Sequence, residues 1–267
     1  MPNFKEVENI KNEIKDNIFY FENTLSKELL DDLILKHYQV LTGVYSENKF
    51  FYKSIFKHSR FILVSMIVAE YYVNEKPRLI DISKRYSSLK LMSKNSVSTF
   101  YSFLVVTGRL KIWKSTLDAR RLKFSITNKA KKEAYDLIIT MNTSFQSSLK
   151  ENPDINVDDF LSSFFKRFHI IINENMLNFE EIEHADIFIH KDAGHMIILS
   201  LFCNKQNLTN EVYESMPLKD LMGNCGVSRS HLKKILQHAE AVGFVENASK
   251  ESNIYITERF LDFTRSY

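Results

Sequence analysis

The sequence contains few of the residues that build tight turns, disulfides or membrane spans. Six Gly and four Pro in 267 residues, against 21 Phe and 12 Tyr, favour a helix-rich fold with few tight turns. Two cysteines, Cys203 and Cys225, are too few for a disulfide framework or a metal cluster and suit a reducing compartment. The first 16 residues are charged, and the longest apolar run, residues 61–69, is about half of a membrane span. We therefore expect a soluble, cytoplasmic protein without a signal peptide or a membrane partner.

Motifs of catalysis are also missing. The sequence has no glycine-rich phosphate loop and no nucleophile elbow. One group of metal-ligating residue types does occur, but no two of its histidines have the spacing of a helical zinc pair: His184, His190, His195, Glu180, Glu181, Glu183 and Asp186. We therefore expect no enzyme, no cofactor and no metal site.

Positive charge is concentrated in one stretch of the chain. Residues 76–133 hold 15 basic and 3 acidic side chains, whereas residues 134–192 hold 4 basic and 11 acidic ones. Residues 193–267 hold 8 of each kind. A polyanion such as DNA is the natural partner of the basic stretch, because each neutralised phosphate releases condensed counterions. The alternative is a basic surface that is merely solvated.

Apolar periodicity predicts several helices around this stretch. Residues 1–56 have helical spacing, residues 61–72 form a buried helix, and residues 128–150 and 158–177 form two more. We expect four regions: an N-terminal helical segment (1–56), a first folded unit (57–134), a helical linker or interface (135–192) and a second folded unit (193–267).

The informative feature is an internal repeat at an offset of 135 residues. Ser93 and Ser228 each follow an apolar residue and precede another four positions later, which predicts a capped helix with a hydrophobic staple. The later apolar positions also coincide: Val97, Phe100, Tyr101, Leu104 and the helix-ending Gly108 match Leu232, Ile235, Leu236, Ala239 and Gly243. Both copies continue with a strand, a polar turn, a second strand, an Ile-Thr pair and a helix.

This order is typical of a winged helix-turn-helix. The sequence therefore predicts a mainly α fold with two small β-wings, at residues 110–126 and 244–256, in tandem winged helix-turn-helix units joined and flanked by helices. In the second copy, Leu218 and Leu221 would anchor the first helix and Gly226 would supply a left-handed turn before the plug Val227. In the first copy, four extra residues after the anchors predict a looser turn.

The first wing resembles that of a known family. Residues 118–130, Asp-Ala-Arg-Arg-Leu-Lys-Phe-Ser-Ile-Thr-Asn-Lys-Ala, look like the wing and next helix start of the multiple-antibiotic-resistance regulator (MarR) family, whose pattern is Asp-x-Arg and then Leu-Thr-x-Lys-Gly. The resemblance covers residues 60–137, under a third of the chain. Ile126 replaces Leu and Ala130 replaces Gly, and the second unit has no counterpart in single-unit members.

The resemblance implies properties as well as a fold. It implies a homodimer joined by terminal helices and de-repression by a small-molecule effector, although two units in one chain could mimic the dimer. It also implies that Arg120 enters the minor groove of DNA and that Asp118 orients it through a charge-assisted pair.

Candidate DNA-binding residues follow from the helix-turn-helix geometry, in which the second helix enters the major groove. On the first recognition helix they are Lys94, Asn95, Ser98, Thr99 and Ser102; on the second they are Ser228, Arg229, Ser230, Lys233, Lys234 and Gln237. Lys111, Lys114, Arg121 and Lys123 alternate along the first wing and would contact phosphates, whereas we expect Trp113 to pack. The alternative is that these are ordinary solvated faces.

The leading hypothesis is a bacterial-type transcriptional regulator that binds double-stranded DNA in a sequence-specific way, with the first copy as main reader. A plasmid-type replication initiator also uses two winged units in one chain. In a third hypothesis, the second unit is a protein-interaction or dimerisation module, because its charge is balanced and residues 134–192 are acidic.

Overall fold

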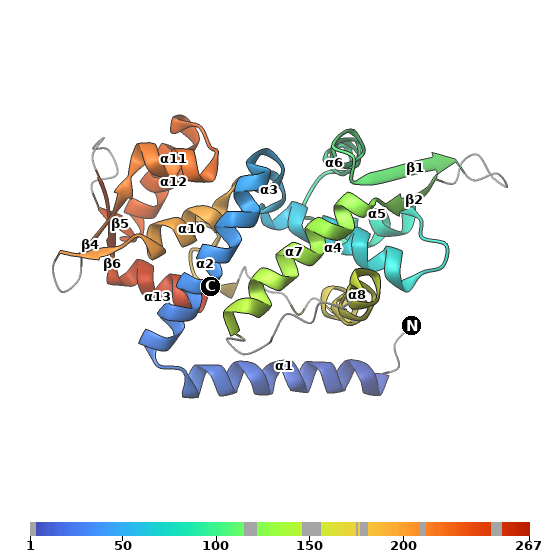
Figure 1. The fold of residues 1–267 in the computed structure, drawn as a ribbon, viewed down its shortest axis with the longest axis horizontal. Helices are drawn as coiled ribbons and strands as arrows, with labels where there is room; N and C mark the ends of the chain where they lie inside the picture. Colours follow the sequence, from blue (N-terminus) through green and yellow to red (C-terminus); the bar gives the residue numbers. More distant parts are fainter. Residues whose placement is uncertain are drawn as a thin grey trace. The chain divides into compact units, whose positions relative to one another are not determined.

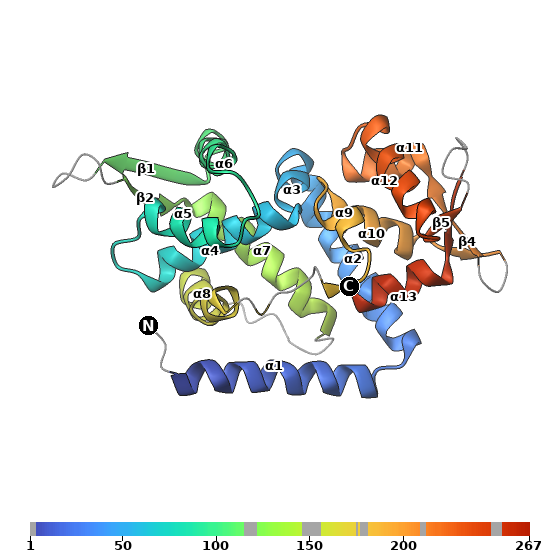
Figure 2. The same cartoon turned by 180° about the vertical axis from the view of Figure 1, so that it is seen from behind.

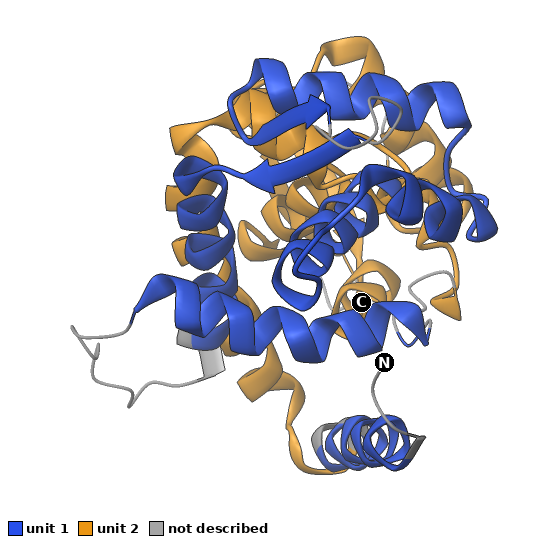
Figure 3. Cartoon of the chain, turned by 90° about the vertical axis from the view of Figure 1, so that its right-hand side faces the viewer, with its two compact units in different colours: residues 1–22, 59–142, 146–177 blue, residues 23–58, 143–145, 178–267 orange. Residues whose placement is uncertain are grey.

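The computed structural model describes residues 4–114, 122–145, 156–174, 176, 181–208, 212–246 and 253–267. The protein is mainly helical and has two small antiparallel sheets, as the sequence predicts (Figure 1). Two compact units are each assembled from separate stretches of the chain (Figure 3). Unit 1 comprises residues 1–22, 59–142 and 146–177, and unit 2 comprises residues 23–58, 143–145 and 178–267. Within the part of the chain that is described, no helix is long and apolar enough to cross a bilayer.

Unit 1 is built from helices and one β-hairpin. Its elements are most of α1 (Phe4–Thr24), α4 (His58–Val73), α5 (Leu79–Ser88), α6 (Lys94–Val106), β1 (Leu110–Lys114), β2 (Leu122–Ile126), α7 (Asn128–Phe145) and α8 (Val157–Asn173). The apolar face of α1 packs on α8, where Val7 and Ile10 cluster with Ile170. Residues 61–72, predicted as a buried helix, lie within α4.

The α4–α6 group forms the core of unit 1. Leu63 and Ile67 of α4, Ile82 of α5 and Leu104 of α6 are all buried, and the hydroxyl of Tyr86 donates to the carbonyl of Ser59 at 2.6 Å. β1 and β2 pair with Leu110 opposite Ile126, and a single bridge joins Arg78, just before α5, to Lys123 of β2. The order is thus helix, bridge, helix, helix, hairpin. We call α4, α5, α6, β1 and β2 the first helix–hairpin segment.

Unit 2 repeats this order with a longer first strand. Its elements are α2 (Lys27–Glu47), α3 (Lys49–Ile55), α9 (Asp186–Ile189), α10 (Gly194–Cys203), β3 (Gln206–Asn207), β4 (Val212–Pro217), α11 (Leu218–Cys225), α12 (Arg229–Ala241), β5 (Val245–Glu246), β6 (Asn253–Thr257) and α13 (Glu258–Ser266). The strands form one antiparallel sheet in the order β3-β4-β6-β5. We call α10, β4, α11, α12, β5 and β6 the second helix–hairpin segment. Pro217 pairs with Asn253 just before α11, as Arg78 pairs with Lys123 just before α5.

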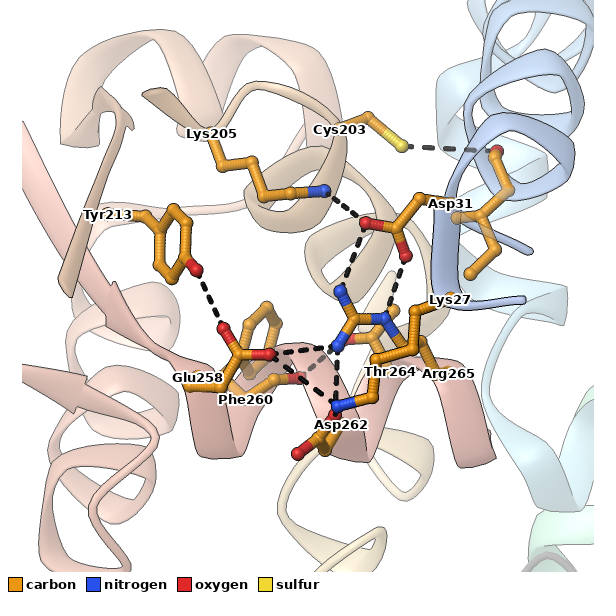
Figure 4. Close-up of polar contacts among 11 residues, drawn as sticks. Lys27, Asp31, Cys203, Lys205, Tyr213, Glu258, Phe260, Asp262, Thr264 and Arg265 are labelled. Atoms are coloured by element: carbon orange, nitrogen blue, oxygen red, sulfur yellow. Dashed lines mark hydrogen bonds and ion pairs between the residues drawn. The ribbon is translucent and has the colours of Figure 1, made fainter. Parts of the chain in front are cut away.

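A network of charged side chains ties α2 to α13 and to the β3–β4 region (Figure 4). Asp31 of α2 accepts from Arg265 Nε at 2.8 Å and from Lys205 Nζ at 3.2 Å, while the Tyr213 hydroxyl donates to Glu258 at 2.7 Å. Burial alone would raise the pKa of Asp31, but the hydrogen bonds and charges of Arg265 and Lys205 hold that pKa below its usual value. The network therefore makes α2 and the C-terminal helix parts of one unit.

Candidate nucleic-acid interface

Helix α6 separates an apolar face from a polar one. The Ser93 hydroxyl caps it by accepting from the Ser96 N–H at 3.2 Å, as the sequence predicts. The inward residues Val97, Phe100, Tyr101 and Leu104 are buried. The proposed contact residues Lys94, Asn95, Ser98, Thr99 and Ser102 are all exposed on the other face. The fold thus leaves this set of side chains available to a partner.

Two of the exposed hydroxyls are turned toward the helix itself. Thr99 Oγ1 donates to the Asn95 carbonyl at 2.9 Å, and Ser102 Oγ donates to the Ser98 carbonyl at 3.3 Å. Their hydrogens are used within the helix, but their lone pairs still face solvent. These two residues are therefore suited to accept hydrogen bonds, for example from an exocyclic amine of a base.

Helix α12 has the same division. The Ser228 hydroxyl accepts from the His231 N–H at 3.3 Å, and Leu232, Ile235, Leu236 and Ala239 are buried. Of the proposed contact residues, Ser228, Arg229, Ser230, Lys234 and Gln237 are exposed, and Lys233 is half-buried. The predicted left-handed turn is confirmed, because Gly226 has φ 64° at the end of α11.

The two segments have the same backbone conformation and hydrogen bond where α6 and α12 end and the hairpins begin. Gly108 and Gly243 both have φ 75°. After each glycine, a backbone N–H returns to the helix: Arg109 to the Leu104 carbonyl at 2.8 Å, and Phe244 to the Ala239 carbonyl at 2.9 Å. This is the bond that closes a helix with a left-handed residue.

The agreement continues at the end of each hairpin. Thr127 Oγ1 donates to the Gly108 carbonyl at 2.8 Å, and Thr257 Oγ1 donates to the Gly243 carbonyl at 2.7 Å. Two residues further on, Lys129 donates to the Thr107 carbonyl at 3.3 Å and Arg259 to the Val242 carbonyl at 2.7 Å. The last two pairs lay outside the aligned motif, and a basic residue two positions after each Thr was the signal that could have found them.

The first hairpin carries three of the predicted phosphate contacts. Lys111 and Lys114 of β1 are exposed, and Lys123 of β2 is half-buried opposite Trp113. Trp113 is 46% exposed and borders a cavity of about 640 Å³ together with Lys123 and Tyr71. Asp118, Arg120 and Arg121 lie outside the described residues, so their roles stay predictions.

Ion pairs reduce the charge that the basic stretch can offer to a partner. Arg109 is 4% exposed and its Nε donates to Glu133 at 2.7 Å, so this cation belongs to the interior. The other described basic residues of 76–133 that pair with carboxylates are Arg78 with Asp81, Arg85 with Glu70, Lys131 with Asp158 and Lys132 with Asp136. The charge count of residues 76–133 omits three of these carboxylates, because Glu70, Asp136 and Asp158 lie outside the stretch.

The two cysteines and two of the candidate histidines contact other residues of unit 2. Burial raises the pKa values of Cys203 and Cys225 to about 12, so neither thiol ionises at neutral pH. His184 contacts Arg259 at 3.2 Å, whereas His195 contacts the Tyr267 hydroxyl at 3.2 Å. Among the residues that the structure describes, no group of three or more His, Cys, Asp or Glu could hold a metal ion.

Comparison with models of known protein families gives no match to this chain. Neither the curated proteins nor the solved structures contain a match.

Proposed function

We propose that the chain is a cytoplasmic, sequence-specific DNA-binding transcriptional regulator with two winged helix-turn-helix units. The α5–α6 and α11–α12 pairs are the helix-turn-helix elements, and the β1–β2 and β5–β6 hairpins are the wings. The observation that carries this proposal is the repeat itself: the same serine cap recurs at the start of each proposed recognition helix, and the same glycine conformation and threonine contact recur at its end, before the hairpin. A helix, a short strand, two helices and a hairpin form the order that the winged helix-turn-helix requires.

Duplex DNA fits this interface better than a protein partner in unit 1. The exposed face of α6 offers an amine, an amide and three hydroxyls, which are the groups that bind base edges and phosphates. Lys111 and Lys114 extend the positive surface along the hairpin. Asn95 is the best candidate for direct reading, since an Asn amide can pair with adenine through two hydrogen bonds.

A plasmid-type replication initiator is the second candidate, and two winged units in one chain favour it. Both candidates bind duplex DNA, but they differ in the arrangement of their sites. An initiator reads direct repeats at an origin, whereas a regulator reads a site beside the genes that it controls. The family resemblance implies a small-molecule effector and a homodimer, and both are part of the regulator hypothesis.

Selection of bound duplexes from a random pool by the full-length chain tests the proposal. We expect a single enriched motif, a protected site longer than one winged unit covers, and affinity that falls steeply with salt. The enriched motif can then be located in the source genome: direct repeats would favour the initiator. Failure to bind any duplex at low salt would overturn both candidates.

A further inference from the structure

Helix α3 and the end of α2 lie against the turn between α11 and α12, within unit 2 (Figures 1 and 2). Lys49 Nζ donates to the Gly223 carbonyl at 2.9 Å, and Lys53 Nζ donates to the Gly226 carbonyl at 3.0 Å. The Tyr45 hydroxyl donates to the Cys225 carbonyl at 2.7 Å. The end of α2 and helix α3 thus contact the C-terminal end of α11, where helix carbonyls lack partners.

These contacts bring two ammonium groups close to the start of α12. Gly226 precedes the capping residue Ser228 by two positions, so the Lys53 ammonium lies within roughly 10 Å of the recognition helix N-terminus. An ammonium has three N–H donors, and the carbonyl bond uses one of them. Lys49 and Lys53 can therefore hold the turn and still donate to an anion.

We propose that Lys49 and Lys53 are phosphate-contacting residues of the second winged unit, supplied by a segment outside it. The inference rests on the proposed function and adds to its interface. Residues 193–267 have balanced charge, and the positive charge of α12 comes from Arg229, Lys233 and Lys234 against one acidic residue, Glu240, so two further cations at the turn would add substantially to it. Backbone phosphates beside the place where α12 would enter the major groove would contact the two ammonium groups. These contacts would position the duplex without reading its sequence.

The salt dependence of binding to a random-sequence duplex of about 30 base pairs tests this, because it counts phosphate contacts. The Lys49→Gln/Lys53→Gln variant should bind roughly 10- to 50-fold more weakly near 0.1 M salt, with a logarithmic salt slope shallower by about 2. Lys36→Gln is the matched control, since Lys36 lies on α2 and pairs with Asp32 on the surface. The control should keep the affinity and slope of the wild type.

A second variant separates charge from the capping of α11. Lys49→Arg/Lys53→Arg keeps the charge, so its salt slope should match the wild type even if its melting temperature falls. All variants are measured at a temperature where circular dichroism shows them folded. A Gln variant with the control's slope and affinity would overturn the inference while leaving the proposed function standing. Absence of DNA binding by the wild type would overturn both.

Discussion

The two helix–hairpin segments share the contacts that their backbones require and differ in how each hairpin is anchored. In the first, buried Arg109 is held by Glu133 of α7. In the second, Phe244 takes the same position and stacks on Phe263 of α13, with ring centroids 4.8 Å apart. A left-handed residue at a helix end admits few residue types. A buried side chain admits more, because it needs only a hydrogen-bonding partner if it is polar or a packed neighbour if it is apolar. The glycines at the helix ends therefore identify the repeat, whereas the buried residue that follows each of them does not.

The units also differ in charge. Counted over the sequence, the stretches of unit 1 hold 22 basic and 16 acidic side chains, and those of unit 2 hold 14 and 17. The net values are therefore +6 and −3. Long-range attraction of a polyanion favours unit 1, whereas unit 2 must rely on local groups such as Arg229 and Lys234. The comparison predicts a division of labour between two segments with the same contacts.

The largest expected effects concern the contacts that hold the hairpins, Arg109 with Glu133 in unit 1 and Phe244 with Phe263 in unit 2. Glu133→Ala removes the carboxylate that pairs with the buried Arg109 guanidinium and should destabilise unit 1 by about 3–5 kcal/mol. Phe244→Ala removes a fully packed ring and should destabilise unit 2 by about 3–5 kcal/mol. Urea unfolding can assign each loss to its unit, because Trp113, the only tryptophan, lies in unit 1.

A double variant sharpens this result. Arg109→Leu with Glu133→Leu replaces the ion pair by apolar groups and should restore most of the stability that Glu133→Ala loses. If the double variant were as unstable as Glu133→Ala, the pair would have a role that packing cannot replace. The contacts that hold the two hairpins would then not be equivalent.

The next effect tests the division of labour in binding. If the first copy is the main reader, Lys94→Ala with Arg120→Ala should weaken DNA binding by at least about 100-fold, because it removes charge and the proposed groove contact. Arg229→Ala with Lys233→Ala should weaken binding by about tenfold and shorten the protected site. Footprinting and fluorescence anisotropy measure both changes. A complete loss in the second variant, with binding retained in the first, would reverse the assignment of the main reader.

Local rules explain why much of the fold could be predicted. Ser93 and Ser228 cap helices, and Gly108, Gly226 and Gly243 have positive φ, because each depends on a few neighbouring residues. Alternating strands after each glycine gave the hairpins for the same reason.

The remainder depends on contacts between distant stretches. The burial of Arg109 could not be predicted, because its partner Glu133 lies 24 residues further along the chain, on α7. Lys49 and Lys53 reach the α11–α12 turn across more than 170 residues, so no spacing in the sequence could indicate them. Counting charge along the chain therefore missed the two cations that folding brings to the turn of the second segment.

A smaller effect compares one histidine from each unit. Burial, together with Arg85, lowers the pKa of His169 in unit 1 to about 4, and burial, together with His37, lowers the pKa of His195 in unit 2 to about 3. Unfolding restores a pKa near 6.5, so the unfolded state takes up protons first and stability falls as pH drops from about 6.5. His169 is partly exposed, and its share should be on the order of 1 kcal/mol between pH 6.5 and 4.

Variants identify the two contributions. His169→Gln should flatten the pH dependence of unit 1, followed by Trp113 fluorescence during urea unfolding at pH 7, 5.5 and 4. His195→Gln should leave that signal unchanged and flatten the dependence seen for unit 2 by circular dichroism. An unchanged slope in both variants would mean that carboxylates such as Asp31 control the acid sensitivity.

The smallest effect concerns the turns between the paired helices, where both segments have a left-handed residue. The second segment uses Gly226 with φ 64°, and the first uses Lys90 with φ 53°. A side chain in this conformation costs roughly 1 kcal/mol, which glycine avoids.

Lys90→Gly should therefore stabilise unit 1 by about 0.5 kcal/mol, since part of the gain is lost to the more flexible unfolded chain. Gly226→Ala should destabilise unit 2 by about 1 kcal/mol through its backbone, because a new Cβ would meet Lys49 Cβ at an ordinary 3.5 Å. Lys90→Ala controls for the lost charge and should give no gain. A gain in stability for Lys90→Gly together with a loss for Gly226→Ala would show that both turns need the same backbone conformation. A loss of stability for Lys90→Gly would show instead that the looser first turn depends on its lysine side chain.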